Sequence, residues 1–122
     1  MVVDPLDPGQ QTDLVFHALA DATRRDIVRS VLETEQSVSG LARRYPMSFA
    51  AVHKHVAVLE RAGLVTKRRS GREQLVRGRL EAARRAYDVF EELEAVWRGR
   101  MDRFEQILAE PETEPDRQGS TQ

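Results

Sequence analysis

Apolar residues recur at helical spacing in several separate stretches of the chain. Their spacing predicts a helix over residues 12–20 and a second one over residues 22–33, with Asp21 as the N-cap of the second. Ser37 is the N-cap expected for a third helix, over residues 38–45. The first part of the chain is therefore predicted to be helical.

A fourth helix is predicted from its N-cap, Ser48, to about Ala62, where Gly63 supplies a left-handed stop. Pro46 separates it from the third helix, because the residue before a proline is pushed out of the α conformation. At 100° per residue, the apolar residues of the fourth helix fall on one side, which we expect to be buried. The opposite side carries Phe49, Ala50, His53, Lys54, Ala57, Glu60 and Arg61.

Two strand-like runs, residues 64–69 and 72–79, flank Ser70-Gly71 and predict a β-hairpin. The longest helical pattern follows over residues 81–109. Its apolar stripe advances by three or four residues at each step and consists of Ala86, Phe90, Leu93, Trp97, Met101, Phe104 and Leu108.

Neither end of the chain has a periodic apolar pattern. We expect residues 1–11 to form a disordered lead and residues 110–122 a disordered acidic tail, around one domain over residues 12–109. No apolar run approaches the roughly 20 residues of a membrane span, and the N-terminus lacks the features of a secretory signal. We therefore expect a cytoplasmic protein that does not contact a membrane.

The predicted order of helix, turn, helix and hairpin is that of a winged helix-turn-helix. The expected fold class is mainly α, with a small β-hairpin wing (α+β). In this arrangement the second helix of the helix-turn-helix pair, here the fourth helix, enters a DNA major groove about 12 Å wide.

Charge is concentrated in the middle of the chain, although the net charge is only −1. Residues 40–79 hold ten Lys and Arg against two acids, which gives +8. Residues 1–39 carry −4 and residues 80–122 carry −5. A basic block of this size is typical of a surface that binds a polyanion. The alternative is a basic face that only improves solubility.

Five residues at the start of the fourth helix are candidates for contact with double-stranded DNA. Phe49 suits a thymine methyl group, and Lys54 suits guanine O6 or N7, or a phosphate. His53 can donate to or accept from a base edge, and Ser48 can donate to a phosphate beside the helix N-terminus. Ala50 leaves clearance for a close approach. Packing of Phe49 at the turn and plain solvation of Lys54 remain alternatives.

The predicted hairpin carries a cluster of cations around its turn, which suits the phosphate backbone or the minor groove. Such contacts supply affinity and orientation more than sequence selectivity. The alternative is an edge strand charged to prevent aggregation. Arg43 and Arg44 of the third helix are expected to hold the backbone from the other side. The hairpin cations are Lys67, Arg68, Arg69 and Arg72.

Three stretches together resemble the arsenical-resistance repressor (ArsR/SmtB) family of bacterial transcription factors. They are FHALADATRRDIVRSVLE, SVSGLARRYPMSFAAVHKHVAVLERAGLV and TKRRSGREQLVRGRL, and the resemblance covers roughly residues 13–108. It implies a homodimer formed through the first and last helices, in agreement with their apolar stripes. The interface residues so expected are Leu14, Val15, Leu19, Phe90, Leu93, Trp97, Met101, Phe104 and Leu108.

The resemblance also bears on sensing, because many members bind metal through cysteines on the third helix or through Asp and His on the last. This chain has no cysteine, and its last helix has no histidine. His53 and His55, two residues apart, point to opposite faces of a helix and cannot chelate one ion together. We expect a member without metal or cofactor, and His55 as a partly buried, hydrogen-bonded residue. An apolar effector beside Trp97 and Phe104 is conceivable, although aromatic residues at this spacing more often form a core.

The function expected from the sequence is that of a homodimeric repressor of transcription, which also represses its own promoter. It would bind an inverted repeat whose half-sites lie about one helical turn, roughly 34 Å, apart. The alternative is a winged-helix interaction module that docks an acidic protein partner. No nucleophile with a base, carboxylate pair or phosphate-binding loop is evident, so we do not expect an enzyme.

Overall fold

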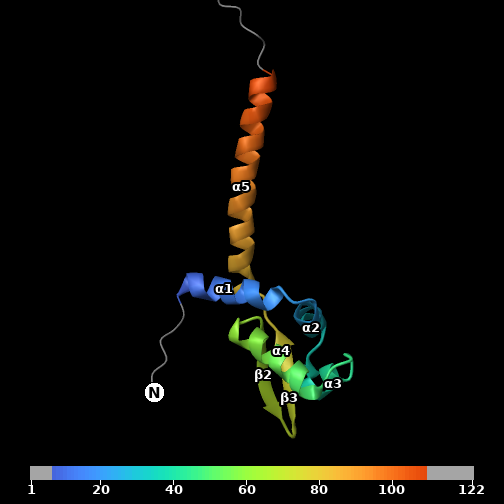
Figure 1. The fold of residues 1–122 in the computed structure, drawn as a ribbon. Helices are drawn as coiled ribbons and strands as arrows, with labels where there is room; N and C mark the ends of the chain where they lie inside the picture. The colour runs from blue at the N-terminus through green and yellow to red at the C-terminus, as the bar shows by residue number, and fades with distance from the viewer. Residues whose placement is uncertain (1–6, 110–122) are drawn as a thin grey trace, which may run out of the picture. The chain divides into compact units, whose positions relative to one another are not determined.

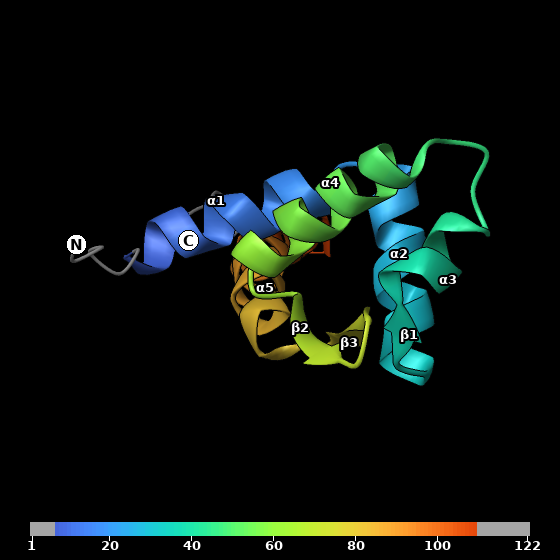
Figure 2. The same cartoon turned by 90° about the horizontal axis from the view of Figure 1, so that it is seen from below.

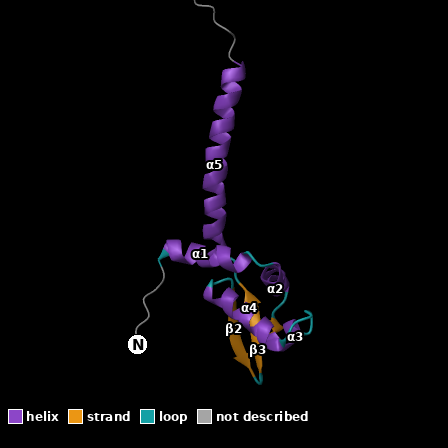
Figure 3. Ribbon diagram, viewed as in Figure 1, coloured by secondary structure: helices purple, strands orange, loops and turns teal. Residues whose placement is uncertain are grey.

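The computed structural model describes residues 7–109 of the 122-residue chain, so the disorder expected for residues 1–6 and 110–122 lies outside it. Figures 1 and 3 show a mainly helical fold with one small sheet, in which the strands are antiparallel and ordered β1-β3-β2. The predicted fold class, mainly α with a hairpin wing, is confirmed. The elements are α1 (Pro8–Leu19), α2 (Ala22–Glu33), β1 (Gln36–Ser37), α3 (Val38–Ala42), α4 (Phe49–Arg61), β2 (Val65–Ser70), β3 (Glu73–Gly78) and α5 (Glu81–Ala109).

The first helix begins earlier than the sequence pattern predicted. Asp7 and Gln10 form a capping box, in which the Gln10 amide donates to Asp7 Oδ1 at 2.7 Å and the Asp7 amide donates to Gln10 Oε1 at 3.1 Å. Pro8 occupies the first helical position, where its fixed φ fits and no backbone N–H is needed. The expectation of a disordered lead was therefore wrong for residues 8–11, because it relied on apolar periodicity and overlooked this cap.

The caps of the next three helices were predicted correctly. Asp21, Ser37 and Ser48 each accept a hydrogen bond from a backbone amide in the first turn of the helix that follows. The third helix ends at Ala42, however, and not at residue 45. Its final amides bond three residues back, with Arg44 N donating to Leu41 O at 2.9 Å, so the helix tightens and closes before Pro46.

The junction between α1 and α2 is built from the ALADATRR stretch. Arg24 donates from Nε to the Ala18 carbonyl at 2.7 Å and from Nη2 to the His17 carbonyl at 3.1 Å, while Arg25 donates to the Leu19 carbonyl at 2.7 Å. These carbonyls belong to the last turn of α1, where few backbone amides remain to bond them, and the His17 carbonyl also accepts from the Ala20 amide at 3.2 Å. The backbone N–H of Arg24, which bonds the Asp21 carboxylate, lowers the pKa of that group. This stretch therefore has a structural role.

The hydrophobic core lies within residues 15–86 and draws on all the elements before α5 except β1, together with the start of α5. Figure 2 shows α1 and α4 side by side, and Gln11 of α1 donates to the Ala62 carbonyl at the end of α4 at 2.6 Å. The largest fully buried side chains are Ile27, Leu41, Leu59, Leu64, Val15, Val31, Val52, Val56, Val65 and Val76.

The sheet contains a strand that was not predicted. β1 has only two residues, which pair with Val76 and Leu75 of β3, and such a short run leaves no period-2 signal in the sequence. The predicted hairpin is present, but its two-residue loop is Gly71-Arg72 and not the predicted Ser70-Gly71, because Ser70 is the last residue of β2 and lies opposite Glu73. Gly71 opens that loop with a φ of 62°, a conformation that glycine adopts without steric cost.

The last helix, α5, has the predicted bounds of residues 81–109. The chain divides into two compact units at residues 88 and 89, within this helix. In the first unit, Ala86 of α5 belongs to the core. In the second unit, most side chains of α5 are exposed, including most of its large apolar ones. No described helix combines the length and apolarity needed to cross a bilayer.

Candidate nucleic-acid interface

The helix α4 is fixed at both ends and along one face. Ser48 Oγ accepts from the Ala51 amide at 3.1 Å, and Gly63, with a φ of 83°, ends the helix as predicted. Val52, Val56 and Leu59 are fully buried. The predicted outer face is confirmed, because each of its members is exposed: Phe49, Ala50, His53, Lys54, Ala57, Glu60 and Arg61.

Phe49 lies on this outer face and outside the core. Its side chain is 53% exposed, whereas Tyr45 and Met47, in the preceding turn, are half-buried against the core. The Phe49 ring stacks on His53, with ring centroids 6.2 Å apart and an angle of 29° between the planes. Of the two alternatives for Phe49, the structure therefore favours a surface role over packing at the turn.

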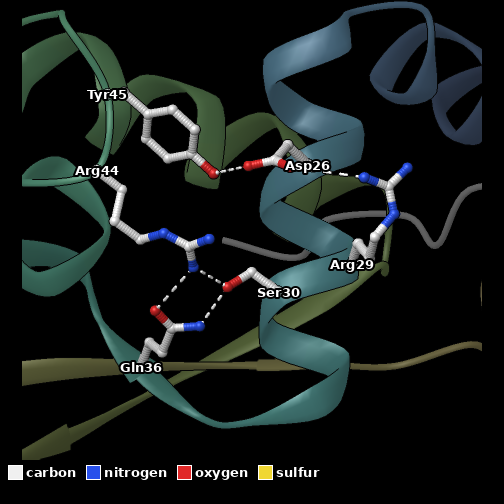
Figure 4. A network of polar contacts seen from close by, with 6 residues as sticks. All are labelled: Asp26, Arg29, Ser30, Gln36, Arg44 and Tyr45. Carbon is white, nitrogen blue, oxygen red and sulfur yellow. Dashed lines mark hydrogen bonds and ion pairs between the residues drawn. The ribbon is translucent and has the colours of Figure 1, made fainter.

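A polar network joins the turn before α4 to α2. Figure 4 shows Tyr45 and Arg44 directed toward α2, where the Tyr45 hydroxyl donates to Asp26 Oδ2 at 2.6 Å and Asp26 pairs with Arg29 at 3.5 Å. Burial, and then the hydrogen bond to Asp26, raise the pKa of Tyr45 to about 12. The phenol thus remains a donor at neutral pH and helps to set the position of the turn that leads into α4.

The two arginines expected to hold the DNA backbone differ in their surroundings. Arg44 donates to Ser30 Oγ and to Gln36 Oε1, the latter at 3.3 Å. Arg43, at the C-cap of α3, is exposed and makes no ion pair within the described residues. Arg43 is therefore the freer of the two candidates.

The wing cations, Lys67, Arg68, Arg69 and Arg72, were predicted to surround the turn as one cluster. The structure separates them, because side chains alternate between the two faces of a strand. Lys67 is half-buried, with its side chain 16% exposed, and its Nζ lies 3.3 Å from Glu60 Oε1 of α4. In contrast, Arg69 and Arg72 are exposed and form no ion pair in the described part of the chain.

Arg68 points to the other face, where it pairs with an acid that the sequence did not suggest. Its Nη2 and Nε donate to Glu35 Oε1 and Oε2 at 2.9 and 3.1 Å, in a bidentate contact. The hydrogen bond from Arg68 lowers the pKa of Glu35, and the same bond raises the pKa of Arg68. Arg68 and Lys67 therefore contribute less free positive charge than a count of residues implies.

The histidines do not form a shared site. His55 is half-buried, and its Nδ1 lies 3.2 Å from Arg24 Nη1, which agrees with the expected hydrogen-bonded residue. Among the described residues, no group of three or more His, Cys, Asp and Glu is placed to hold a metal ion.

The residues expected at a dimer interface fall into two groups. Val15 is fully buried in the core, so its assignment to the interface was wrong, while Leu14 and Leu19 are half-buried against that core. An apolar stripe at helical spacing on α1 is compatible both with burial in the core and with a dimer interface, so the sequence pattern alone did not separate the two. Met101 is half-buried. The other candidates on α5 are between 56% and 71% exposed: Phe90, Leu93, Trp97, Phe104 and Leu108.

Four more apolar side chains are exposed on α5 or just before it and were not singled out from the sequence. They lie beside the predicted stripe, so a wider apolar face would have included them. Leu80 and Tyr87 also line a shallow hollow in the first unit, together with Glu81, Ala83 and Arg84. The four are Leu80, Tyr87, Val96 and Ile107.

Comparison with known proteins agrees with this geometry. A helix-turn-helix domain family (HTH_20) matches residues 19–68. The ArsR-like transcriptional regulator from Rhodococcus sp. RHA1 is 32% identical, with a TM-score of 0.73, over 88% of this chain and 100% of that one. The chain belongs to the ArsR family. Both the fold and the family of this ArsR-family chain are therefore those of transcriptional regulators.

Two further relatives bear on function. The HTH-type transcriptional regulator Rv2034 of Mycobacterium tuberculosis is 44% identical over 59 residues, which are 48% of this chain and 55% of the relative. The chain thus spans about half the length of that regulator. A homodimeric winged helix-turn-helix DNA-binding domain from Mycobacterium bovis (Mb0332) is 25% identical, with a TM-score of 0.57, over 79% of this chain and 89% of that one.

Proposed function

We propose that this ArsR-family chain is a homodimeric repressor of transcription that binds an inverted-repeat operator. The observation that carries the proposal is the outer face of α4. Its first two turns present Phe49, Ala50, His53 and Lys54 to solvent on a capped helix whose opposite face is buried. A slim, exposed helix start of this kind fits a major groove, where its N-terminal residues meet base edges.

The proposal assigns phosphate contacts to the cations that the structure leaves free. Arg43 at the end of α3 and Arg69 and Arg72 at the wing tip are exposed and outside the described ion pairs. Ser48, at the N-terminus of α4, adds a hydroxyl and the neighbouring backbone amides for one more phosphate. Such contacts supply salt-dependent affinity, while the residues of α4 supply sequence preference.

Dimerisation is proposed through α5. This helix exposes more apolar surface than a monomeric protein normally leaves in contact with water. The exposed apolar side chains include Phe90, Leu93, Trp97 and Phe104. The relative from Mycobacterium bovis is homodimeric. Two copies related by a twofold axis would present two α4 helices to half-sites about one helical turn apart.

Action without a bound metal ion is part of the proposal. The three histidines have separate surroundings. His55 contacts Arg24, His53 stacks on Phe49, and His17 lies exposed on α1. We further propose that the chain has no catalytic activity and that it acts in the cytoplasm, where its DNA target would be. Stoichiometric zinc or nickel in the purified protein would contradict the metal-free assignment.

The test of the function is selection of binding sites from a random duplex pool, followed by footprinting on the promoter upstream of the chain's own gene. We expect an enriched inverted repeat, a protected region overlapping that promoter, and an affinity that falls steeply with salt. Sedimentation of the free protein should give a dimer. Retention of a protein partner with no enrichment of any DNA sequence would favour the interaction module.

A further inference from the structure

The exposed ring of Phe49 is the most unusual feature of the proposed DNA face. It is the first residue of α4, 53% exposed, and it is not among the side chains packed on the core. Removing an aromatic side chain from water is favourable, so a ring left exposed on a binding face gains free energy when a partner covers it.

His53 stacks on this ring. The two residues are four apart, so they lie on the same face of α4, and their rings stack at 6.2 Å with 29° between the planes. Ala50 and Ala57, on the same outer face, have only a methyl side chain. The stacked ring pair therefore stands beside two small residues, and the stacking reduces the side-chain freedom that is lost when a partner covers the rings.

Phenylalanine has no hydrogen-bonding group, which limits what it can recognise on a base edge. In the major groove, the apolar feature that distinguishes one base pair from another is the C5-methyl group of thymine. We propose that Phe49, positioned by His53, recognises a pyrimidine C5-methyl group in each half-site. The ligand class is a 5-methylpyrimidine, so 5-methylcytosine satisfies the contact as thymine does. This inference rests on the proposed DNA-binding function.

The experiment uses the full chain and a duplex obtained by selection from a random pool. Each thymine of the selected site is replaced in turn by uracil, which removes only the methyl group. We expect one position in each half-site to weaken binding about fourfold, the effect of exposing one buried methyl group. Replacing both symmetric positions should weaken binding about 16-fold. At the same position, 5-methylcytosine should bind about fourfold better than cytosine.

Variants of Phe49 and His53 test which side chain distinguishes the thymine site from the uracil site. Phe49→Ala should bind the thymine and uracil sites equally. His53→Ala should reduce the discrimination, and His53→Tyr should restore it, because an aromatic ring again stacks on Phe49. The matched control is Lys54→Ala, which removes a neighbouring side chain of the same face. It should weaken binding to both sites while keeping the ratio between them.

The possible outcomes distinguish a failure of the methyl contact from a failure of the proposed DNA-binding function. Enrichment of a site whose uracil replacements all bind equally well would overturn the methyl contact and leave DNA binding intact. Discrimination that persists unchanged in Phe49→Ala would assign the methyl group to another residue and also overturn the inference. Failure to enrich any sequence would count against the proposed function itself.

Discussion

The ion pairs of the wing lead to a quantitative prediction about salt dependence. Replacing Arg69 and Arg72 by glutamine removes the two exposed cations at the wing tip of each protomer. Each phosphate contact contributes about 0.9 to the slope of log affinity against log salt concentration. If each arginine contacts one phosphate, a dimer loses four contacts, and the slope becomes shallower by about 3.6.

Lys67 supplies the matched control, because it belongs to the same strand but pairs with Glu60 at 3.3 Å and is only 16% exposed. The Lys67→Gln, Glu60→Gln double variant removes both members of this pair, so it leaves no unpaired carboxylate beside the DNA and should leave the slope nearly unchanged. The assay is fluorescence anisotropy of a labelled duplex over a series of salt concentrations, with thermal melting to confirm that each variant folds. A slope change for this control as large as that for the Arg69→Gln, Arg72→Gln double variant would refute the division between paired and free cations.

Three further predictions concern stability. Arg24→Ala removes the guanidinium that bonds the His17 and Ala18 carbonyls, and it should lower the free energy of unfolding by about 2 kcal/mol in urea titrations. Gly78→Ala places a Cβ 2.7 Å from Leu32 Cδ2 and 3.0 Å from Leu32 Cα, and the overlap should cost about 1–3 kcal/mol in the same assay, with only partial relief from Leu32→Ala. In a Tyr87→Phe variant, Tyr45 is the remaining tyrosine, and its tyrosinate absorbance should rise near pH 12. Because the folded pKa of Tyr45 exceeds the unfolded value of about 10, its contribution to stability is complete below pH 10 and is lost as pH rises toward 12. Absorbance that rises with a midpoint near 10 would contradict both the burial of Tyr45 and its hydrogen bond to Asp26.

The helices that carry the site were predictable because their signals are local. Ser48 and Gly63 bracket α4, and each acts on the backbone within a few residues of itself. The division of α4 into buried and exposed faces followed from the 3.6-residue period alone. The same period could not show whether Val15 lies in the core or at a dimer interface, because an apolar stripe on α1 fits both places. In the structure, Val15 is buried in the core.

The features that were missed depend on contacts between distant segments. Glu35 and Arg68 are 33 residues apart in the sequence and meet only because β1 pairs with β3 and β3 pairs with β2. The contact from Gln11 to the end of α4 spans 51 residues. No window of sequence contains both partners, so a count of charges along the chain treats paired and free cations alike.

This pairing also explains how a chain of net charge −1 can present a DNA-binding face. Glu60 and Glu35 are the acids in ion pairs with the wing cations, and each is matched by Lys67 or Arg68. The positive charge of each partner therefore offsets the repulsion that either carboxylate would exert on a phosphate. Beyond a Debye length of about 8 Å at physiological salt, exposed acids elsewhere are largely screened. Binding therefore depends on the local charge balance on the α4 face and at the wing tip. At the wing tip, Arg69 and Arg72 are exposed and outside the described ion pairs, and they outnumber the exposed acid Glu73.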